Sequence, residues 1–184
     1  MTTFVVLIRG FNVGGRNKVP MADLKRVLSG EGYDNVRTLL ASGNVIVRSG
    51  KSAAAVTTQI QDALAREFRL DSEVAVRVLT LAELRAVVKD RPSGFGDDPK
   101  KYHSDAIFLM GIGMTAALKV FDPREGVDEL WPGKDVIYHR RLSSLRTKTR
   151  LNKVMATPEY LSMTIRSWGT VLKLQDLAET VQSE

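Results

Sequence analysis

The sequence contains an internal repeat with an offset of about ninety residues, and this repeat constrains the fold more than any other feature. The apolar positions of one helix-like segment, Leu81, Leu84, Val87 and Val88, recur ninety residues later as Val171, Leu174, Leu177 and Ala178. The triplet Val45-Ile46-Val47 recurs ninety-one residues later as Val136-Ile137-Tyr138. Because two separate elements repeat at almost the same offset, we expect two tandem structural units.

Hydrophobic periodicity predicts the same order of elements in each half. In the first half we expect strands at 3–8, 36–40, 45–47 and 74–78, and helices that begin at 20 and 52. In the second half we expect strands at 106–110, 127–130, 136–138 and 163–165, and helices at 114–120 and 145–155. The order βαββαβ predicts an α+β fold with two tandem ferredoxin-like halves, each an antiparallel sheet covered by helices.

The predicted boundaries leave one short connector. Residues 1–90 form the first half, which includes a glycine-rich loop at 10–19, and residues 104–184 form the second half with a C-terminal helix. The connector at 91–103 is rich in Pro and Gly and is either a plain linker or a lid over a site. The first strand and the hairpin lie eleven residues further apart in the first half than in the second, and this surplus falls in the glycine-rich loop.

Composition excludes several classes of chemistry. The 184 residues include no cysteine and two histidines, so we expect no disulfide, no metal site and no cofactor. No apolar run approaches the ~20 residues of a membrane span, and we expect a cytoplasmic protein without a membrane partner. The net charge of +6 is concentrated at 136–158, which holds six Lys and Arg residues and no acidic residue. Such a segment attracts anions or is a solvated basic surface.

The glycine-rich loop begins R-G-F-N-V-G-G-R-N-K at residues 9–18. Gly10 and Gly15 have the spacing of a phosphate-binding loop. However, Pro20 starts the helix too late for its N-terminus to face a phosphate, and Asn17 lacks the hydroxyl that would bind magnesium. The sequence therefore argues against a nucleoside triphosphatase.

Sheet geometry predicts a different site at this loop. In a βαββαβ unit the end of the first strand and the turn of the hairpin share one edge of the sheet, so polar residues from both should converge. The predicted ligand-binding set is Arg9, Asn12, Gly14, Gly15, Arg16, Lys18, Ser42 and Asn44. Cations and free backbone N–H groups bind phosphate or carboxylate. The alternative is that the glycines only turn the chain and that Asn12 caps a backbone group.

The second half contains another candidate site, at the opposite edge of its sheet. The predicted members are His103, Arg140, Arg141, Arg166 and Trp168. Arginines beside an indole suit an anionic or aromatic ligand. Alternatively, Trp168 is a core residue, as most tryptophans are.

Two further readings of the sequence find little support. RNA-recognition domains share this plan and stack bases on strand aromatics, but only Phe4, Phe108 and Tyr138 stand on the relevant strands. No set of nucleophile, base and orienting acid can be assigned, so the catalytic residues are unknown.

Four segments together resemble the bacterial domain-of-unknown-function family 1697. They are R-G-F-N-V-G-G-R-N-K-V-P-M at 9–21, A-S-G-N-V at 41–45, G-F-G-D-D-P-K-K-Y-H at 94–103 and T-I-R-S-W-G-T-V-L-K-L at 164–174. The resemblance implies two ferredoxin-like halves and carries over no catalytic role. The family usually reads T-T-R-N-W-N-T near the C-terminus, and Ile165, Ser167 and Gly169 depart from that pattern.

We therefore expect a protein that binds a phosphorylated or other anionic ligand, either a small molecule or nucleic acid, at the first loop. The alternatives are a metal-independent enzyme that acts on an anionic small molecule, and a scaffold with no small ligand.

Overall fold

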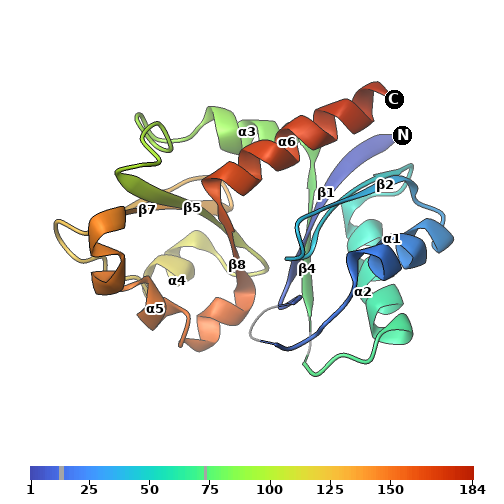
Figure 1. The fold of residues 1–184 in the computed structure, drawn as a ribbon, viewed down its shortest axis with the longest axis horizontal. Helices are drawn as coiled ribbons and strands as arrows, with labels where there is room; N and C mark the ends of the chain where they lie inside the picture. Colours follow the sequence, from blue (N-terminus) through green and yellow to red (C-terminus); the bar gives the residue numbers. More distant parts are fainter. Residues whose placement is uncertain (13–14, 73) are drawn as a thin grey trace. The chain divides into compact units, whose positions relative to one another are not determined.

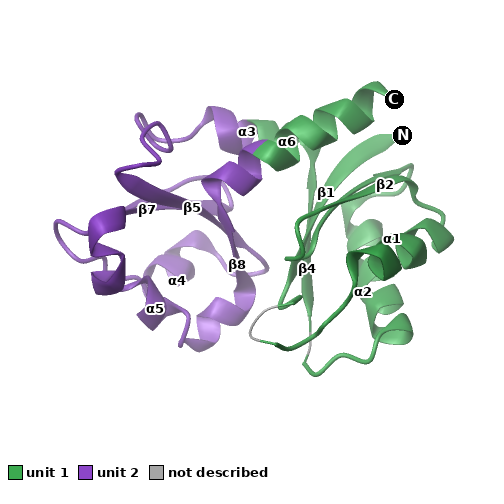
Figure 2. Ribbon diagram, in the orientation of Figure 1, with its two compact units in different colours: residues 1–85, 173–184 green, residues 86–172 purple. Residues whose placement is uncertain are grey.

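The chain forms two four-stranded antiparallel sheets with helices (Figure 1), which confirms the predicted α+β class. The computed structural model describes residues 1–12, 15–72 and 74–184. Two compact units are distinguished in Figure 2: residues 1–85 with 173–184, and residues 86–172. The last twelve residues, assigned from sequence to the second half, cluster with the first unit.

The sheet of the first unit has the strand order β2-β3-β1-β4. Its elements are β1 (Thr2–Arg9), α1 (Met21–Gly30), β2 (Asp34–Leu39), β3 (Asn44–Ser49), α2 (Ala53–Glu67) and β4 (Ala75–Thr80). Strand β1 pairs antiparallel with both β3 and β4. Alternate side chains of β1, namely Phe4, Val6 and Ile8, pack with apolar residues of α1 and α2 into one buried core. Helix α3 (Leu81–Lys89) follows β4.

The second unit repeats this topology with the strand order β6-β7-β5-β8. Its elements are β5 (Tyr102–Leu109), α4 (Met114–Leu118), β6 (Asp128–Pro132), β7 (Val136–Leu142), α5 (Leu151–Val154), β8 (Met163–Ser167) and the start of α6 (Trp168–Ser183). Two 3-10 segments, η1 (Ser143–Lys148) and η2 (Pro158–Ser162), flank α5. Ile107 and Ile137 on one face of the sheet pack with Ala117 of α4 and Leu151 of α5.

The prediction of one helix over 145–155 is wrong. The segment consists of η1, an extended residue at Thr149 with ψ of 144°, and the single turn α5. The Thr149 hydroxyl and the Arg150 amide both donate to the buried carboxylate of Asp128. These tertiary hydrogen bonds hold the chain extended where local periodicity favours a helix.

The connector packs into the core of the second unit. Phe95 is fully buried, and its ring makes edge contacts with Trp131, Tyr138 and Trp168. Gly96, at φ of 83°, lies directly against the indole of Trp168. Phe95 and Gly96 are therefore part of the aromatic core on the face of the sheet opposite α5.

No helix among the described residues has the length and apolarity that a bilayer crossing requires.

Candidate functional site

The glycine-rich loop, which follows β1, and the turn between β2 and β3 lie together at one end of the strands of the first sheet. The Asn12 side-chain amide donates to the carbonyl oxygen of Ala41 at 2.7 Å, and the Ile8 backbone N–H donates to that of Gly43 at 2.7 Å. A Cβ atom at Gly43 would lie 2.8 Å from the Ile8 carbonyl oxygen, so only glycine fits there. The loop and the turn are held together by backbone contact.

The asparagines of the loop bind the protein itself. Asn12 also donates to the Val19 carbonyl and accepts from the Val19 amide, at 3.0 and 2.8 Å. The Asn17 side chain, 1% exposed, donates to the Gly10 carbonyl and the Ser72 hydroxyl and accepts from the Asp71 amide. Both asparagines have positive φ, at 52° and 46°. The Asn12 side chain therefore caps backbone groups, which is the alternative to ligand binding that the sequence analysis gave for this residue.

The side chain of Asn44 is also engaged within the protein. It is fully buried and donates to the Leu39 carbonyl and the Ser42 hydroxyl, both at 3.0 Å. Of the predicted loop residues, Gly15, Arg16 and Lys18 are exposed, Arg9 is half-buried, and Gly14 lies outside the described residues. Arg16 and Lys18 thus present two cations on a loop that asparagines hold in place.

The structure divides the predicted second site between the two faces of its sheet. His103 pairs with Arg141, and Ser104 pairs with Arg140, across β5 and β7. Because successive side chains of a strand point to opposite faces, Arg140 and Arg141 point away from each other. Arg141 lies with His103 on the α5 face, whereas Arg140, Arg166 and Trp168 belong to the opposite face.

The residues on that opposite face are committed to packing. The Arg140 guanidinium lies 4.2 Å from the Tyr102 ring centroid and 5.2 Å from that of Trp131, and it pairs with Glu129 at 2.6 Å. Trp168 is 5% exposed, which is the core role that the sequence left open. Burial lowers the pKa of Arg166 to about 10.

The strand aromatics do not form a base-stacking platform. Phe4, Phe108 and Tyr138 are each at most 2% exposed, and the Tyr138 hydroxyl donates to the Val87 carbonyl at 2.7 Å. Stacking of RNA bases requires exposed rings. The ring faces that an RNA-recognition surface would use are therefore inside the protein.

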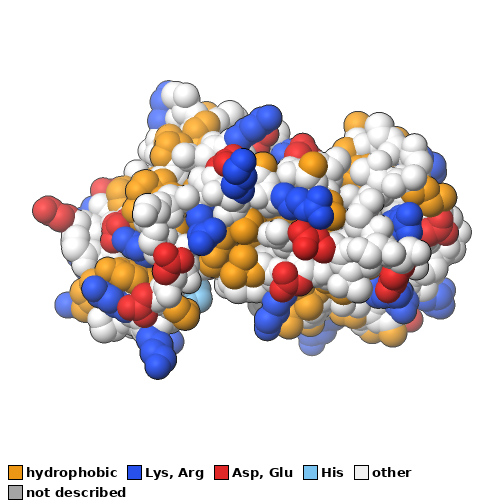
Figure 3. All heavy atoms as spheres, turned by 90° about the horizontal axis from the view of Figure 1, so that it is seen from above, with side chains coloured by type: hydrophobic (Ala, Val, Ile, Leu, Met, Phe, Trp, Pro, Cys, Tyr) orange, Lys and Arg blue, Asp and Glu red, His pale blue; other side chains and the backbone are white. Residues whose placement is uncertain are grey.

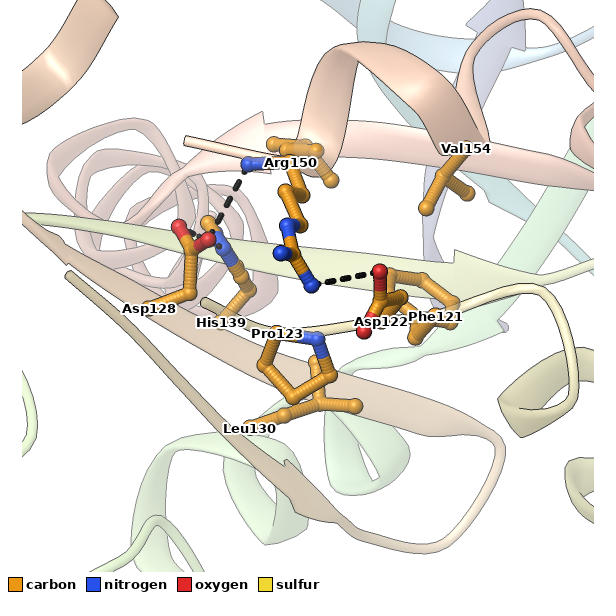
Figure 4. A pocket seen from close by; sticks show the side chains of 9 residues that line it. Phe121, Asp122, Pro123, Asp128, Leu130, His139, Arg150 and Val154 are labelled. Carbon is orange, nitrogen blue, oxygen red and sulfur yellow. Dashed lines mark hydrogen bonds and ion pairs between the residues drawn. The ribbon is translucent and has the colours of Figure 1, made fainter. Parts of the chain in front are cut away.

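A row of ionisable side chains, centred on the buried Asp128, His139 and Asp105, crosses the α5 face of the second unit, and the sequence analysis did not predict it. Asp128 accepts from the Thr149 hydroxyl at 2.5 Å, from the Arg150 and Arg124 amides at 3.0 and 3.1 Å, and from His139 Nε2 at 3.3 Å. Figure 4 shows the Asp128 carboxylate joined by dashed lines to the His139 ring and to the Arg150 backbone nitrogen. These groups fix the start of α5 to β6 and β7.

Asp105 lies at the other end of this row of ionisable side chains, and its side chain is 5% exposed. Its carboxylate accepts from Arg141 Nη1 at 2.7 Å and lies 3.2 Å from His103 Nε2. His139 Nδ1 lies 3.9 Å from Asp105 Oδ2, which is too long for a hydrogen bond. Polar residues on the inward face of an apolar strand were the available signal, but the predicted strand began one residue after Asp105.

The pKa values of both carboxyl groups are lowered. Burial raises the pKa of Asp105, but His139, Arg141 and His103 together lower it by more. Burial likewise raises the pKa of Asp128, and the Thr149 hydroxyl, the Arg150 and Arg124 amides and His139 more than offset this. Both residues are therefore ionised at neutral pH.

Asp105 and Arg141 also line an open pocket of about 330 Å³ in the second unit. Its other polar lining residues are Arg146, Thr149, Asn152 and Tyr160, and its apolar ones are Leu151, Met155 and Ile165. This volume is at the lower end of the usual range for small-molecule sites, roughly 300–1,000 Å³.

The basic segment 136–158 is partly neutralised by acidic residues from elsewhere in the unit. Arg140 pairs with Glu129, Arg141 with Asp105, and Arg150 with Asp122 at 2.5 Å. Among the described residues no ion pair involves the other three, Arg146, Lys148 and Lys153. On the molecular face drawn in Figure 3, basic and acidic side chains are interspersed.

Within the part of the chain that the structure describes, no cluster of three or more His, Asp or Glu residues is placed to hold a metal ion.

Comparison with known proteins connects these features to a family. The family described as "Protein of unknown function (DUF1697)" matches residues 1–138, about three quarters of the chain. The chain belongs to the DUF1697 family. Its fold is similar to that of the conserved bacterial protein SP0830 from Streptococcus pneumoniae, with a TM-score of 0.82 and 26% identity over 96% of this chain and 98% of that one. No curated protein matches the sequence.

The motifs that this DUF1697 chain carries have structural roles here. The first two motifs form the clamped loop and turn, and the third and fourth supply Gly96 and Trp168 of the aromatic core. Of the positions that depart from the family pattern, Ile165 lines the pocket, and the Ser167 hydroxyl bonds that of Thr170 at 2.8 Å in the first turn of α6.

Proposed function

We propose that this protein binds a phosphorylated small molecule at the glycine-rich loop, through Arg16 and Lys18. One observation carries the proposal. The side chains of Asn12 and Asn17 form hydrogen bonds within the loop and with adjacent segments, whereas the side chains of Arg16 and Lys18 are exposed to solvent. Hydrogen bonds hold Asn17, which lies between the two cations, in one place, and cations on a backbone that is already ordered bind an anion with less loss of conformational entropy.

The backbone of the loop supports this proposal. Gly10 and Gly15 have φ of 80° and 78°, and a Cβ atom at Gly15 would meet no atom of the described residues beyond its chain neighbours within 4 Å. A phosphate could therefore approach the main chain at Gly15 closely. The carboxylate of Asp71, which lies between α2 and β4, accepts from the backbone N–H of Asn17 at 3.1 Å. A negative charge thus lies beside the two cations, which favours a compact anionic ligand over a long polyanion.

A binding screen on the full chain tests the proposal. Sugar phosphates, nucleotides, RNA and single-stranded DNA are compared by thermal shift, and positive ligands are measured by calorimetry. We expect a phosphorylated small molecule to bind, and Arg16→Ala and Lys18→Ala each to weaken its binding by about 10- to 100-fold, since a charged hydrogen bond contributes about 1.5–3 kcal/mol.

Lys25→Ala is the matched control, because Lys25 is an exposed cation on α1. The Lys25→Ala variant should bind the phosphorylated ligand with the same affinity as the unmodified protein. Equal weakening by all three substitutions would show only a general effect of net charge and would overturn the site. A stronger response to RNA or DNA than to every small phosphate would replace the small molecule with nucleic acid as the ligand.

A further inference from the structure

We infer that the pocket of the second unit binds a small organic monocarboxylate, with Arg146 as the residue that pairs with the carboxylate. This site is separate from the glycine-rich loop and does not depend on the function proposed there. It rests on the charge balance of the pocket, on the rigidity of the wall that carries Arg146, and on the apolar floor.

The charge balance selects an anion with a single charge. Arg141 and Asp105 form an ion pair at 2.7 Å in which both side chains are largely buried, at 18% and 5% exposed, so their charges cancel. Arg146 is exposed and belongs to none of the ion pairs formed by the described residues. One guanidinium is therefore left to be neutralised by the ligand.

The carboxylate of Asp105 also discriminates against a dianion. It lines the pocket and is ionised, because the pKa of this buried carboxyl group is lowered by His139, Arg141 and His103 more than burial raises it. Because the charge of Asp105 cancels that of Arg141, the ligand meets one net positive charge, that of Arg146. A phosphate monoester carries nearly two negative charges at pH 7, so one of them would stay uncompensated in the pocket, whereas the single charge of a carboxylate would be neutralised. The planar guanidinium of Arg146 matches a carboxylate in a bidentate pair.

The wall of the pocket is held in place before any ligand arrives. The chain between Arg146 of η1 and Asn152 of α5 is fixed at its midpoint, where Thr149 and Arg150 bind the buried Asp128. Leu151 is 7% exposed in the core beneath. A preformed wall reduces the entropy lost on binding.

The apolar residues indicate the rest of the ligand. Leu151, Met155 and Ile165 face the same space as Arg146, and Tyr160 adds a ring with a hydroxyl group. A hydrocarbon portion attached to the carboxylate would contact these side chains, and the flexible Met155 adapts to its shape. An aromatic or short aliphatic carboxylate therefore fits better than an inorganic anion.

The test uses the full chain with benzoate, hexanoate, benzamide and inorganic phosphate as probes, measured by calorimetry and by changes in amide NMR shifts. We expect benzoate or hexanoate to bind with shifts at η1 and α5, and benzamide and phosphate to bind at least about tenfold more weakly. Arg146→Ala should lower carboxylate affinity at least about tenfold. Lys148→Ala, at a neighbouring exposed cation outside the pocket lining, should leave it within about twofold.

A second variant tests the selectivity. Asp105→Asn keeps the size of the side chain but removes its charge, and we expect the ratio of phosphate to benzoate affinity to rise about tenfold or more. The inference is overturned if no carboxylate binds, if phosphate binds as tightly as benzoate to the unmodified protein, or if Arg146→Ala and Lys148→Ala have equal effects. Arg16→Ala should leave benzoate binding unchanged, which separates this result from any outcome at the glycine-rich loop.

Discussion

The backbone of Gly96 lies so close to the indole of Trp168 that a Cβ atom at this glycine would be 2.3 Å from Cδ1 of the ring. These residues are 72 positions apart in the sequence, and each stands in one of the four segments in which the sequence analysis found a resemblance to the family. Phe95 fills the space beside them, 5.1 Å from Trp168 between ring centroids. The motif at 94–103 therefore has a packing function that is independent of any ligand.

We expect Gly96→Ala to lower the free energy of unfolding by about 2–4 kcal/mol, because it combines a left-handed backbone with overpacking of the core. Gly94→Ala is the matched control, since Gly94 also has positive φ, 74°, but a Cβ atom there meets nothing within 4 Å. It should cost about 1–2 kcal/mol. Urea denaturation measures both. Equal costs would show that contact with Trp168 is unimportant.

Asn17→Ala should destabilise the protein by about 2–3 kcal/mol, because it leaves the Gly10 carbonyl and the Asp71 amide without their buried partner. Asn17→Gly retains the positive φ and removes only the side-chain hydrogen bonds, so it separates these from backbone strain. Arg16→Ala, next to it and exposed, should change stability by less than about 0.5 kcal/mol. A loss for Asn17→Gly no larger than that for Arg16→Ala would contradict the clamping role of this asparagine.

Acid should weaken the second unit through Asp105 and Asp128. Both pKa values are lowered in the folded state, so the stability they provide is present above the unfolded value of about 4 and is lost as pH falls below it. Asp128→Asn should cost about 2–4 kcal/mol at pH 7, and the gap to the unmodified protein should narrow below pH ~4. Urea titrations at a series of pH values measure the gap. A gap that stays constant down to pH ~2 would contradict the assignment.

Two tyrosines should ionise only in strong alkali. Burial raises the pKa of Tyr33 and of Tyr138 to about 12, and the nearby Glu31 and Asp90 add to the effect on each. Folding stability that depends on these neutral hydroxyls is complete below pH ~10 and is lost as pH rises through 12. Ultraviolet absorbance of tyrosinate follows the titration, and Tyr138→Phe and Tyr33→Phe should each remove one late transition. Ionisation of all tyrosines near pH 10 would rule this out.

Much of the fold could be predicted from sequence because it depends on local periodicity. The continuous apolar run of β1 and the repeat of the two halves predict the order βαββαβ and an antiparallel sheet in each half, and the structure has both. The helix expected at 145–155 failed because its conformation is decided by Asp128, a residue about twenty positions away in sequence. Propensity cannot represent such a tertiary hydrogen bond.

The candidate sites were harder to predict, for geometric reasons. Arg140 and Arg141 are neighbours in sequence and lie near the same end of β7, but successive side chains of a strand point to opposite faces of the sheet. The predicted strand begins at residue 106, whereas the structure pairs Asp105 within β5, where its carboxylate accepts from Arg141. Predicting which strand ends lie together is therefore insufficient. The residues of a site must also lie on the same face of the sheet, and the predicted face of each residue depends on where its strand begins.

The division of the chain into units affects the order in which the protein can fold during translation. Residues 173–184 belong to the first unit, so the ribosome makes the whole of 86–172 before this unit has all of its parts. Strand β1, with the apolar run from Phe4 to Ile8, also waits for β3 and β4 before it is paired on both sides. The nascent chain therefore carries an incomplete first unit while the second is synthesised, and apolar surface that residues 173–184 later cover is open to aggregation and to chaperones during this interval.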